Sequence, residues 1–532
     1  MLGFFLALLP LLIVLAGILF ARQSGARMAV VGWAAAMVMA CTYFETPLEV
    51  AFGATAYGMI KAMKISMAVV LTMLMIFLMR ETGALKTIAD AIKRVARTRE
   101  EQALFIGMGF GSFVTALGAL TIALFPPLLM ALGFTPFGAV SVAVLGYDPL
   151  TSFALLSLPI TIPAGASAHM LGPENAFTAS ELAYRISIFL PLVSVALAFA
   201  MLWVIGGKAA MKRGFVPALI SGLVISLSAL GFTYFEILPV RIVGIVSGLL
   251  AMISLITYQK LFRRGDCEND SPKEPVNWPA LLRAASPWLM LMVVAGVISV
   301  PPIQKFLAGL STSAEKITVF ADQKVDLSIF SQIYFWILVV LILSTAILAP
   351  SKNQIKRVAS VWIKNMWGPF IAFSVYFSIA YVMFFSAMEV NPEGMLAPGP
   401  EYQALNMDVV VGTTLAKVFG FGFVFVAASL GLFGAVVGGS ETASNIMFMK
   451  VQHKACMDIG LTSEQFMTVY GSHATGGGIA SAMTPAKING AVAMLDDPDR
   501  ELEGRVMRKH VVIAFSITIL VGLMTGIVVG LG

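Results

Sequence analysis

The stretch from Gly431 to Gly490 reads GLFGAVVGGSETASNIMFMK over 431–450 and VYGSHATGGGIASAMTPAKING over 469–490. It lies in an apolar region, yet it holds a glutamate, a histidine, a lysine and several hydroxyl side chains. Because polar groups without partners are costly in lipid, the stretch must face protein or a water-filled cavity. Its glycines and Thr-Pro indicate broken helices that bind a solute with exposed backbone ends. The alternative is close helix packing through small residues.

The composition around this stretch is that of an integral membrane protein. The chain has 532 residues, of which 58% are hydrophobic and only 12% charged, against about 25% charged in ordinary soluble domains. Apolar runs recur at the length that crosses a bilayer, so the fold class is all-α and polytopic. The three cysteines, Cys41, Cys267 and Cys456, form no CxxC or His/Cys cluster. We expect no disulfide framework, metal or other cofactor, and no nucleic-acid partner.

Ten simple spans and two interrupted apolar regions account for the chain. The spans are expected at about 2–20, 28–44, 66–79, 186–206, 215–235, 242–261, 285–300, 327–349, 368–388 and 511–530. The interrupted regions cover 103–170 and 409–495, and each has to make one net crossing. Lys and Arg gather in alternate connections, which we place in the cytoplasm by the positive-inside rule. The sequence therefore predicts a multi-pass protein of a bacterial or archaeal cytoplasmic (inner) membrane, with both termini outside.

The two interrupted regions resemble each other while running in opposite directions. Each has a Phe-Gly motif, a Phe fifteen positions later, a Gly-hydrophobe-Thr turn, a later glycine followed by a polar residue, and a proline. In order, these are Phe110-Gly111, Phe125, Gly133–Thr135, Gly146, Asp148 and Pro159 in the first region, and Phe433-Gly434, Phe448, Gly460–Thr462, Gly471, His473 and Pro485 in the second. This pattern predicts inverted-topology repeats. The alternative is that glycine-rich membrane segments align by chance.

The repeats divide the chain into three parts. The first inverted repeat is expected over 1–207 with its core region at 103–171, and the second over 284–532 with its core region at 409–495. Two further spans and a polar cytoplasmic loop connect them over 208–283. Each core region is expected to hold a re-entrant hairpin followed by a broken helix, or else three spans, which gives about 12–16 membrane segments, with an elevator-type movement as one option. Residues 84–97 are predicted as an amphipathic helix in the cytoplasmic interface, or else a basic loop.

The motifs then resemble one known family. GLFGAVVGGSETASNIMF (431–448) is similar to the segment of the L-lactate permease family in which Gly-Ser-Asp-Thr-Ser-Ser-Asn precedes an apolar run. ATGGGIASAMTPAKI (474–488) resembles that family's Thr-Thr-Gly-Gly stretch before a Ser-Pro, and ALGFTPFGAV, SLPITIPAG, SVPPIQKFL and KHVVIAF extend the likeness over most of the chain. The resemblance implies symport, the import of L-lactate, glycolate or a related small 2-hydroxymonocarboxylate with protons.

Several positions depart from the family pattern. The Glu-Gly-rich run of the family corresponds here to FVTALGALTIALFPP (113–127), with Thr115 near the acidic position. Its Asn-Thr pair corresponds to Gly146-Tyr147-Asp148, its aspartate to Glu441 and a later Asn to His473. The substrate or coupling ion can therefore differ, and a sodium-coupled or differently selective organic anion transporter remains an alternative.

The same motifs supply candidate site residues. A small carboxylate is stabilised by free N–H groups and helix N-termini, with hydroxyls and amides contacting its oxygens. For substrate binding we predict Ser440, Thr442, Ser444, Asn445, Thr475, Gly476 and Gly477, joined through the repeat by Thr115, Thr121 and Thr161. For each hydroxyl, a hydrogen bond back to its own helix is the alternative.

Proton coupling needs a group that binds and releases a proton away from water. Glu441 is the leading candidate, because a carboxylic acid removed from water holds a proton more readily. Asp148 and His473 follow, and Lys487 is a candidate charge partner of Glu441 or of the substrate, unless it reaches to the cytoplasmic surface. Lys61 and Lys64 are weaker candidates for attracting anions from outside.

Two other function classes remain as alternatives. A membrane-embedded enzyme is disfavoured, since the sequence has no HExxH, GxSxG or phosphate-binding loop and no long soluble segment. A channel would show non-saturating flux. The sequence does not decide whether the protein forms a homodimer.

Overall fold

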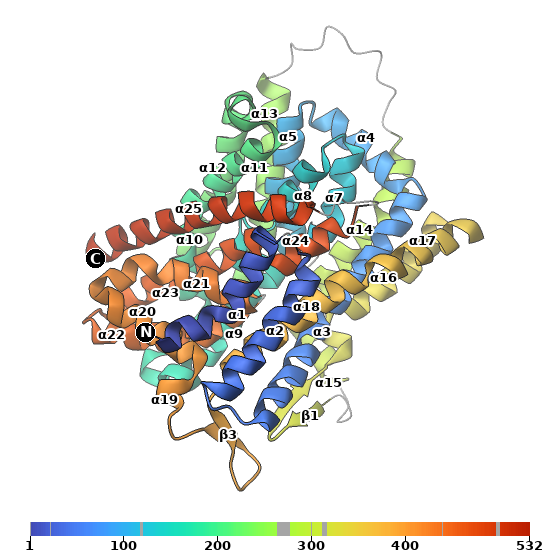
Figure 1. Ribbon diagram of the computed structural model, residues 1–532. Coiled ribbons are helices and arrows are strands. Elements are labelled where there is room, and N and C mark those ends of the chain that lie inside the picture. Colours follow the sequence, from blue (N-terminus) through green and yellow to red (C-terminus); the bar gives the residue numbers. More distant parts are fainter. Residues whose placement is uncertain are drawn as a thin grey trace.

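The computed structural model describes residues 2–21, 23–116, 121–262, 277–298, 300–310, 316–438, 440–495 and 501–531. These are almost entirely helical (Figure 1). In this described part, nine helices are long and apolar enough to cross a membrane, and four shorter apolar helices accompany them. The all-α polytopic class is confirmed, and the helices agree with the expected 12–16 membrane segments.

The first half of the chain runs from α1 to α11. Its helices are α1 (Leu2–Leu19), α2 (Gly25–Thr42), α3 (Leu48–Glu81), α4 (Ala84–Val95), α5 (Arg99–Leu104), the π-helix η1 (Phe105–Phe110), α6 (Gly111–Ala116), α7 (Thr121–Ala131), α8 (Pro136–Leu145), η2 (Thr151–Phe153), α9 (Ala154–Leu171), η3 (Pro173–Asn175), α10 (Ala179–Ser187) and α11 (Leu190–Arg213). The two expected connecting spans are α12 (Phe215–Tyr234) and α13 (Val240–Phe262). The polar loop that follows lies mostly outside the described residues.

The second half adds two short β-hairpins. Its elements are α14 (Trp278–Ile298), α15 (Pro301–Gly309), β1 (Lys316–Phe320), β2 (Gln323–Asp326), η5 (Ile329–Ser331), α16 (Ile333–Leu348), α17 (Lys352–Asn365), α18 (Trp367–Phe384), β3 (Met388–Val390), β4 (Leu396–Pro398), α19 (Tyr402–Leu405), α20 (Met407–Phe419), η6 (Gly420–Gly422), α21 (Phe423–Gly438), α22 (Glu441–Asp458), α23 (Ser463–Ile479), η7 (Ala480–Met483), α24 (Pro485–Val492) and α25 (Leu502–Leu531). Each β-hairpin is antiparallel, with Ile317 opposite Val325 and Glu389 opposite Ala397.

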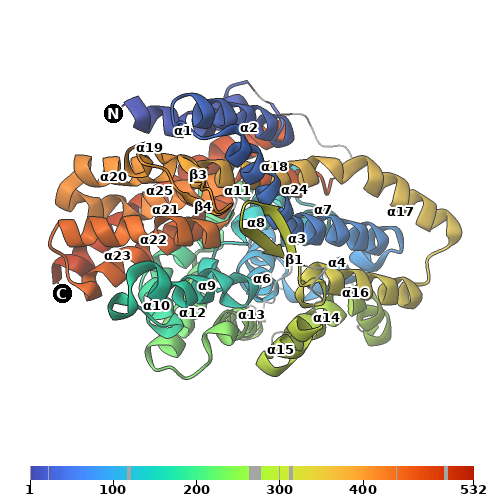
Figure 2. The same ribbon diagram turned by 90° about the horizontal axis from the view of Figure 1, so that it is seen from below.

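The two β-hairpins lie at the end of the molecule that faces the viewer in Figure 2. They are joined there, because the backbone N–H of Leu396 donates to the Asp322 carboxylate over 2.9 Å. This hydrogen bond is the main cause that holds the pKa of Asp322 below its usual value, and a hydrogen bond from Gln323 adds to it.

Both halves contain a helical hairpin with the same internal contact. In the first, α5, η1 and α6 lead to α7; in the second, α21 leads to α22. A Cβ placed on Gly111 would lie 3.0 Å from Cε2 of Phe125, and one on Gly434 would lie 2.6 Å from Cε2 of Phe448. The sequence matches therefore correspond to one packing contact that occurs twice.

The turn after each hairpin is also the same. Gly133 and Gly460 both adopt a left-handed conformation, with φ of 90° and 80°, which a residue with a Cβ rarely takes. Two residues later, Thr135 and Thr462 accept backbone hydrogen bonds from the first turns of α8 and α23. Shared turn chemistry supports the repeat, and its proposed boundaries stay a prediction.

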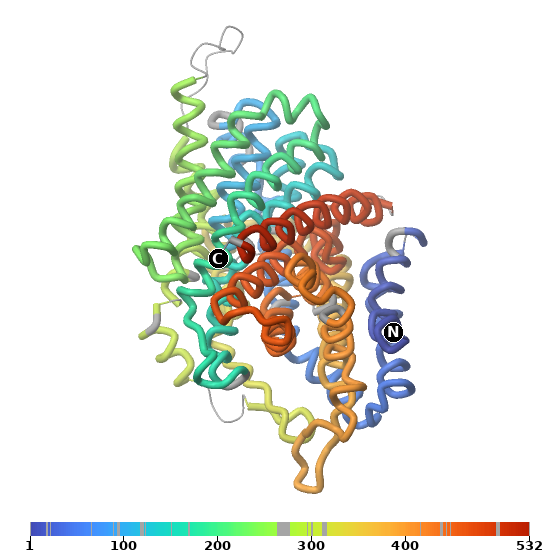
Figure 3. The backbone as a smooth tube through the Cα atoms, turned by 90° about the vertical axis from the view of Figure 1, so that its left-hand side faces the viewer, coloured from blue at the N-terminus to red at the C-terminus, as the bar shows by residue number. Residues whose placement is uncertain are grey.

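Helices of the first half pack on helices of the second half in matching pairs. Helix α2 packs on α18 while α16 packs on α3; α4 packs on α14 while α20 packs on α1; and α7 packs on α24 while α22 packs on α9. The long helices α3 and α18 pack on each other, so closely that a Cβ on Gly58 would lie 2.6 Å from Cα of Ser378. Such an exchange of partners is what a pseudo-twofold axis between two repeats produces. In Figure 3, α1 and α2 (dark blue) lie at the edge opposite the green helices α12 and α13.

Two predicted elements need correction. The span expected at 66–79 is part of α3, which extends over Leu48–Glu81, because the segment before it also packs on α18, closely so at Gly58. The amphipathic segment is helical, as predicted, but Leu85, Ile88 and Ile92 are buried and α4 packs on α14 and α7. Its apolar face is therefore covered by protein instead of lying on the lipid interface.

Candidate functional site

The tip of the second hairpin meets the broken helix of the first half. Glu441 begins α22 at this tip, and the Ser152 hydroxyl donates to its Oε1 atom. One turn further along α22, the Asn445 amide donates to the Pro159 carbonyl over 3.0 Å. Both contacts join residues that are almost 300 positions apart, so they exist only because the two halves interlock.

Asp148 lies in the break of the first broken helix, between α8 and α9. Its side chain is fully buried, and neither carboxylate oxygen has a hydrogen-bond partner within the part of the chain that the structure describes. The Ser481 hydroxyl and the Ala482 backbone N–H face it without meeting hydrogen-bond geometry. A buried carboxylate with unused oxygens is costly to keep in a protein core, which points to a functional role.

Lys487 supplies a positive charge within electrostatic range of both acids. It lies on α24, directly after the break formed by η7 and Thr484, and its ammonium donates to the Ser481 hydroxyl. The ammonium also lies over the Tyr147 ring, 4.1 Å from the centroid. It is within electrostatic range of both Asp148 and Glu441. Asp148, Ser152, Glu441, Ser481 and Lys487 form what we call the central cluster.

Two members of the central cluster were not predicted. Ser152 and Ser481 were missed because a serine in an apolar segment usually bonds back to its own helix. The sequence did contain one indication of their role, because each serine lies near a proline: Ser152 follows Asp148-Pro149, and Ser481 precedes Thr484-Pro485. In the structure both serines lie in short 3-10 turns beside the helix breaks, Ser152 in η2 and Ser481 in η7.

Some predicted substrate residues instead line a cavity on the other side of the hairpin tip. Ser440 and Thr442, which flank Glu441, border a cavity of about 400 Å³ together with residues of α3, α9, α18 and β2. Lys61 lies on the opposite wall. Glu441, a member of the central cluster, thus stands in the chain directly between two residues that line this cavity.

Other predicted residues hold the hairpin together. The Thr475 hydroxyl donates to the Gly471 carbonyl of its own helix over 2.8 Å. A Cβ on Gly476 would lie only 1.9 Å from the Ala428 carbonyl oxygen, and one on Gly477 would lie 3.1 Å from Cγ of Glu441. All three lie within the intact helix α23, which breaks only at 480–484. The glycine cluster therefore lies ahead of the break on the broken span, where it allows α21 and α23 to approach, and Gly477 makes room for Glu441; its role in substrate binding stays a prediction.

His473 lies inside the second half, away from the break. Its Nδ1 atom is 2.9 Å from the Gln452 amide nitrogen, which can only donate, so Nε2 carries the proton toward the Ser444 hydroxyl at 3.2 Å. Ser444 in turn donates to the Gly431 carbonyl. The Tyr470 ring stacks on the imidazole with centroids 5.9 Å apart. Asp148 and His473 align in sequence but not in structure, because α23 runs on past the position where α8 ends.

The three threonines predicted from the first half lie on α6, α7 and α9. Thr115 is buried at the end of α6, and its hydroxyl has no hydrogen-bond partner within the described ranges. Of Thr121 only the backbone is described, at the start of α7. Thr161 is half-buried on α9, one residue before the cavity-lining Ile162. The hairpin tip between α6 and α7, at 117–120, lies outside the described residues.

The fold and the central cluster define a polytopic helical membrane protein with a buried polar centre between two interlocked halves. The family model for L-lactate permease matches residues 3–532. An L-lactate permease of Bacillus subtilis (strain 168) is 22% identical, covering 92% of this chain and 89% of the relative. A glycolate permease of Escherichia coli (strain K12) is 24% identical, covering 96% of this chain and 93% of the relative. Among solved structures, the Alcanivorax borkumensis YdaH transporter matches 86% of this chain and 85% of its own at 11% identity and a TM-score of 0.29, which does not define a shared fold.

The chain belongs to the L-lactate permease family. The resemblance seen in its motifs is therefore confirmed over nearly its whole length. Membership makes the protein a multi-pass membrane permease and points to a transporter rather than an enzyme.

Replacing His473 with Leu is expected to destabilise the protein while leaving the pH dependence of transport unchanged. The variant leaves the buried amide of Gln452 without its imidazole partner, which costs about 1–3 kcal/mol, while the Ser444 hydroxyl keeps its hydrogen bond to the Gly431 carbonyl. The melting temperature of the purified protein measures the effect. The double variant with Gln452→Leu serves as control, because its loss should be smaller than the sum of the two. A shifted pH profile at unchanged stability would instead support His473 as a proton carrier.

Proposed function

We propose that the protein is a secondary active transporter that imports L-lactate, glycolate or a related small 2-hydroxymonocarboxylate together with protons. Its relatives are named as L-lactate and glycolate permeases. The observation that carries the proposal is the central cluster, where Ser152 of the first half donates to Glu441 of the second and Lys487 lies within electrostatic range of Asp148 and Glu441.

The charge of the central cluster explains how an anion and a proton can travel together. Two ionised carboxylates and one ammonium sum to −1, which repels an anion. Protonation of Glu441 makes the sum zero, and Lys487 is then free to attract a carboxylate. The substrate hydroxyl can exchange hydrogen bonds with Ser152 and Ser481, which already donate to and accept from this cluster. Each substrate anion thus enters with one proton.

The arrangement of helices suggests what moves. The paired helices α3 and α18 form one wall of the cavity, and the tip of the second hairpin with α9 forms the other. We infer that the hairpins and broken helices move as a unit along α3 and α18, in an elevator-type cycle, in a bacterial or archaeal inner membrane. With the basic connections in the cytoplasm, both termini face outside.

Uptake into liposomes tests the proposal directly. Purified protein is reconstituted, and uptake of labelled L-lactate and glycolate is measured with a pH gradient, with a sodium gradient and with neither. Saturable uptake that only the pH gradient drives uphill is the expected result. Uptake driven by sodium alone would replace the proton with sodium, and non-saturating flux would indicate a channel.

Replacing Lys487 with Met is expected to abolish lactate uptake. The change leaves Asp148 and Glu441 facing each other without a counter-charge, so stability should also fall. The loss should stay below the about 3–5 kcal/mol of a fully buried pair, since Lys487 is half-buried. The control is the double variant with Asp148→Asn, which removes the excess charge and should recover the melting temperature without recovering uptake. Full uptake by the single variant would exclude Lys487 from the site.

A further inference from the structure

The cavity beside the hairpin tip is larger and more aromatic than a two- or three-carbon acid requires. Its volume of about 400 Å³ lies in the range of pockets for drug-sized ligands, roughly 300–1,000 Å³. It opens between α3, α18, β2, α9 and the start of α22. Its walls are formed by Tyr57, Lys61, Ile162, Gln323, Phe377, Ala380, Tyr381, Phe384, Phe385, Ser440, Thr442 and Ile446.

One end of this cavity suits a carboxylate. Lys61 is the cation of its lining, and its ammonium lies 5.1 Å from the centroid of the Tyr57 ring. Lys61 forms no ion pair with the residues that the structure describes. The charged groups nearby are Lys64 on the same helix and Asp326 at the end of β2, which is close to Lys64. An anion reaching Lys61 therefore meets an excess of positive charge. The hydroxyl-bearing residues Ser440 and Thr442 line the wall contributed by the hairpin tip.

The rest of the cavity suits an apolar or aromatic group. The rings of Tyr57 and Tyr381 are 4.9 Å apart and nearly perpendicular, and Phe385 lies 5.6 Å from Tyr57 and 6.0 Å from Tyr381. Phe320 of β1 packs against the Tyr57 and Phe385 rings and closes this group from outside. Rings in such edge-to-face arrangements favour a further aromatic partner. Neither lactate nor glycolate has a group that would use this surface.

We propose that this cavity binds monocarboxylates that carry an aryl or other bulky apolar substituent, with the carboxylate at Lys61 and the substituent among Tyr57, Tyr381 and Phe385. The proposal rests on the proposed function in that the cavity borders the Ser440–Thr442 tip through which the substrate would pass. It extends the substrate class to aryl-substituted 2-hydroxy acids, which would bind here before reaching Glu441.

Binding measurements on the full chain test this assignment. The protein, purified in detergent, is titrated calorimetrically with 3-phenyllactate, L-lactate and the uncharged 3-phenylpropane-1,2-diol. Burial of a phenyl group should make 3-phenyllactate bind at least about tenfold more tightly than lactate. The diol should bind more weakly than 3-phenyllactate, because it lacks the charge that faces Lys61.

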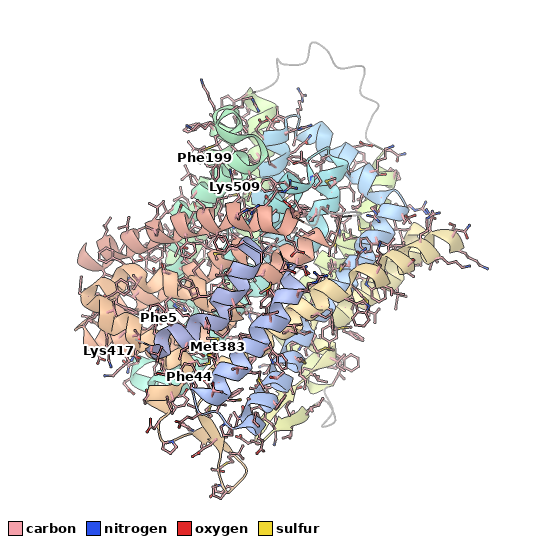
Figure 4. The ribbon with its side chains drawn as sticks, viewed as in Figure 1. Phe5, Phe44, Phe199, Met383, Lys417 and Lys509 are labelled. Atoms are coloured by element: carbon pink, nitrogen blue, oxygen red, sulfur yellow. The ribbon has the colours of Figure 1, made fainter. Side chains whose placement is uncertain are left out.

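Three variants separate the two ends of the cavity. Lys61→Met should weaken 3-phenyllactate binding at least about tenfold, and Lys61→Arg, which keeps the charge, should recover most of it. Tyr381→Leu should lower the preference for 3-phenyllactate over lactate. The control is Lys417→Met, because Lys417 is an exposed lysine of α20 at the edge of the molecule (Figure 4). Binding by this control should match that of the unaltered protein.

The outcomes distinguish the two proposals. Equal affinity for 3-phenyllactate and lactate would overturn the aromatic site, and so would Lys61 and Tyr381 variants that bind like Lys417→Met. Neither result would contradict the proposed transport of lactate, which liposome uptake tests separately. Tight, Lys61-dependent binding of 3-phenyllactate by a protein that takes up neither lactate nor glycolate would support the cavity and overturn the proposed substrates. Melting temperatures of all variants show whether each is folded.

Discussion

Replacing Glu441 with Gln is expected to abolish uptake driven by a pH gradient while leaving exchange of labelled for unlabelled substrate intact. The glutamine carbonyl can still accept the Ser152 hydroxyl, so the contact between the halves is kept. It cannot bind or release a proton. The variant should therefore behave as if residue 441 were always protonated. It should carry substrate in both directions but should not accumulate it.

Two liposome assays measure this effect. Uphill uptake under an imposed pH gradient should fall to the level of empty liposomes, and counterflow at equal pH should proceed at a rate near that of the unaltered protein. Glu393→Gln is the matched control, because Glu393 is exposed in the turn between β3 and β4. Unchanged gradient-driven uptake by the Glu441 variant would remove Glu441 from the coupling mechanism. Asp148 would then be the remaining carboxylate of the central cluster.

Replacing Gly476 with Ala is expected to destabilise the protein severely. The added Cβ would lie 1.9 Å from the Ala428 carbonyl oxygen, and on the facing helix a Cβ on Gly431 would lie 1.8 Å from the His473 carbonyl oxygen. Since backbone atoms face the new methyl group on α21, no side-chain rotation relieves the clash. The loss should reach or exceed the upper end of the about 1–3 kcal/mol that extra methylenes cost in a well-packed core.

Thermal unfolding and size-exclusion elution of the purified variant check this expectation. Gly231→Ala is the control, because Gly231 lies on α12 with open space at its Cβ position. It should leave stability unchanged or raise it slightly, as alanine favours helix. If Gly476→Ala were as stable as the unaltered protein but no longer bound substrate, the glycine would be a backbone ligand instead of a packing residue.

Much of the architecture follows from local sequence. Apolar runs specify membrane helices because lipid tolerates no unpaired backbone group, and this holds whatever the helices pack against. Gly133-Phe134-Thr135 and Gly460-Leu461-Thr462 specify the same turn twice, because a left-handed residue and a helix cap depend only on their neighbours. The repeat could therefore be found from sequence.

The sequence also identified the charged residues of the site but not how they meet. Glu441, Asp148 and Lys487 stand out because ionisable groups are costly in an apolar segment. That Lys487 lies within electrostatic range of both acids, and that Ser152 binds Glu441, depends on the interlocking of two halves almost 300 residues apart. No local pattern encodes such a distance.

For the polar residues within α21–α23, composition does not distinguish solute binding from helix packing, and the tertiary structure was needed to separate these two roles. Glycine and hydroxyl side chains suit either solute binding or helix packing, and only the positions of the neighbouring backbones distinguish them. Gly476 faces a carbonyl on α21 and Thr475 bonds to its own helix, so both hold the hairpin together. Ser440 and Thr442, at the start of α22, line a cavity together with residues of α3, α9 and α18. The sequence by itself determined which segments are apolar enough to cross the membrane and which groups are costly to bury; the contacts between the halves determined which of those groups meet in the central cluster.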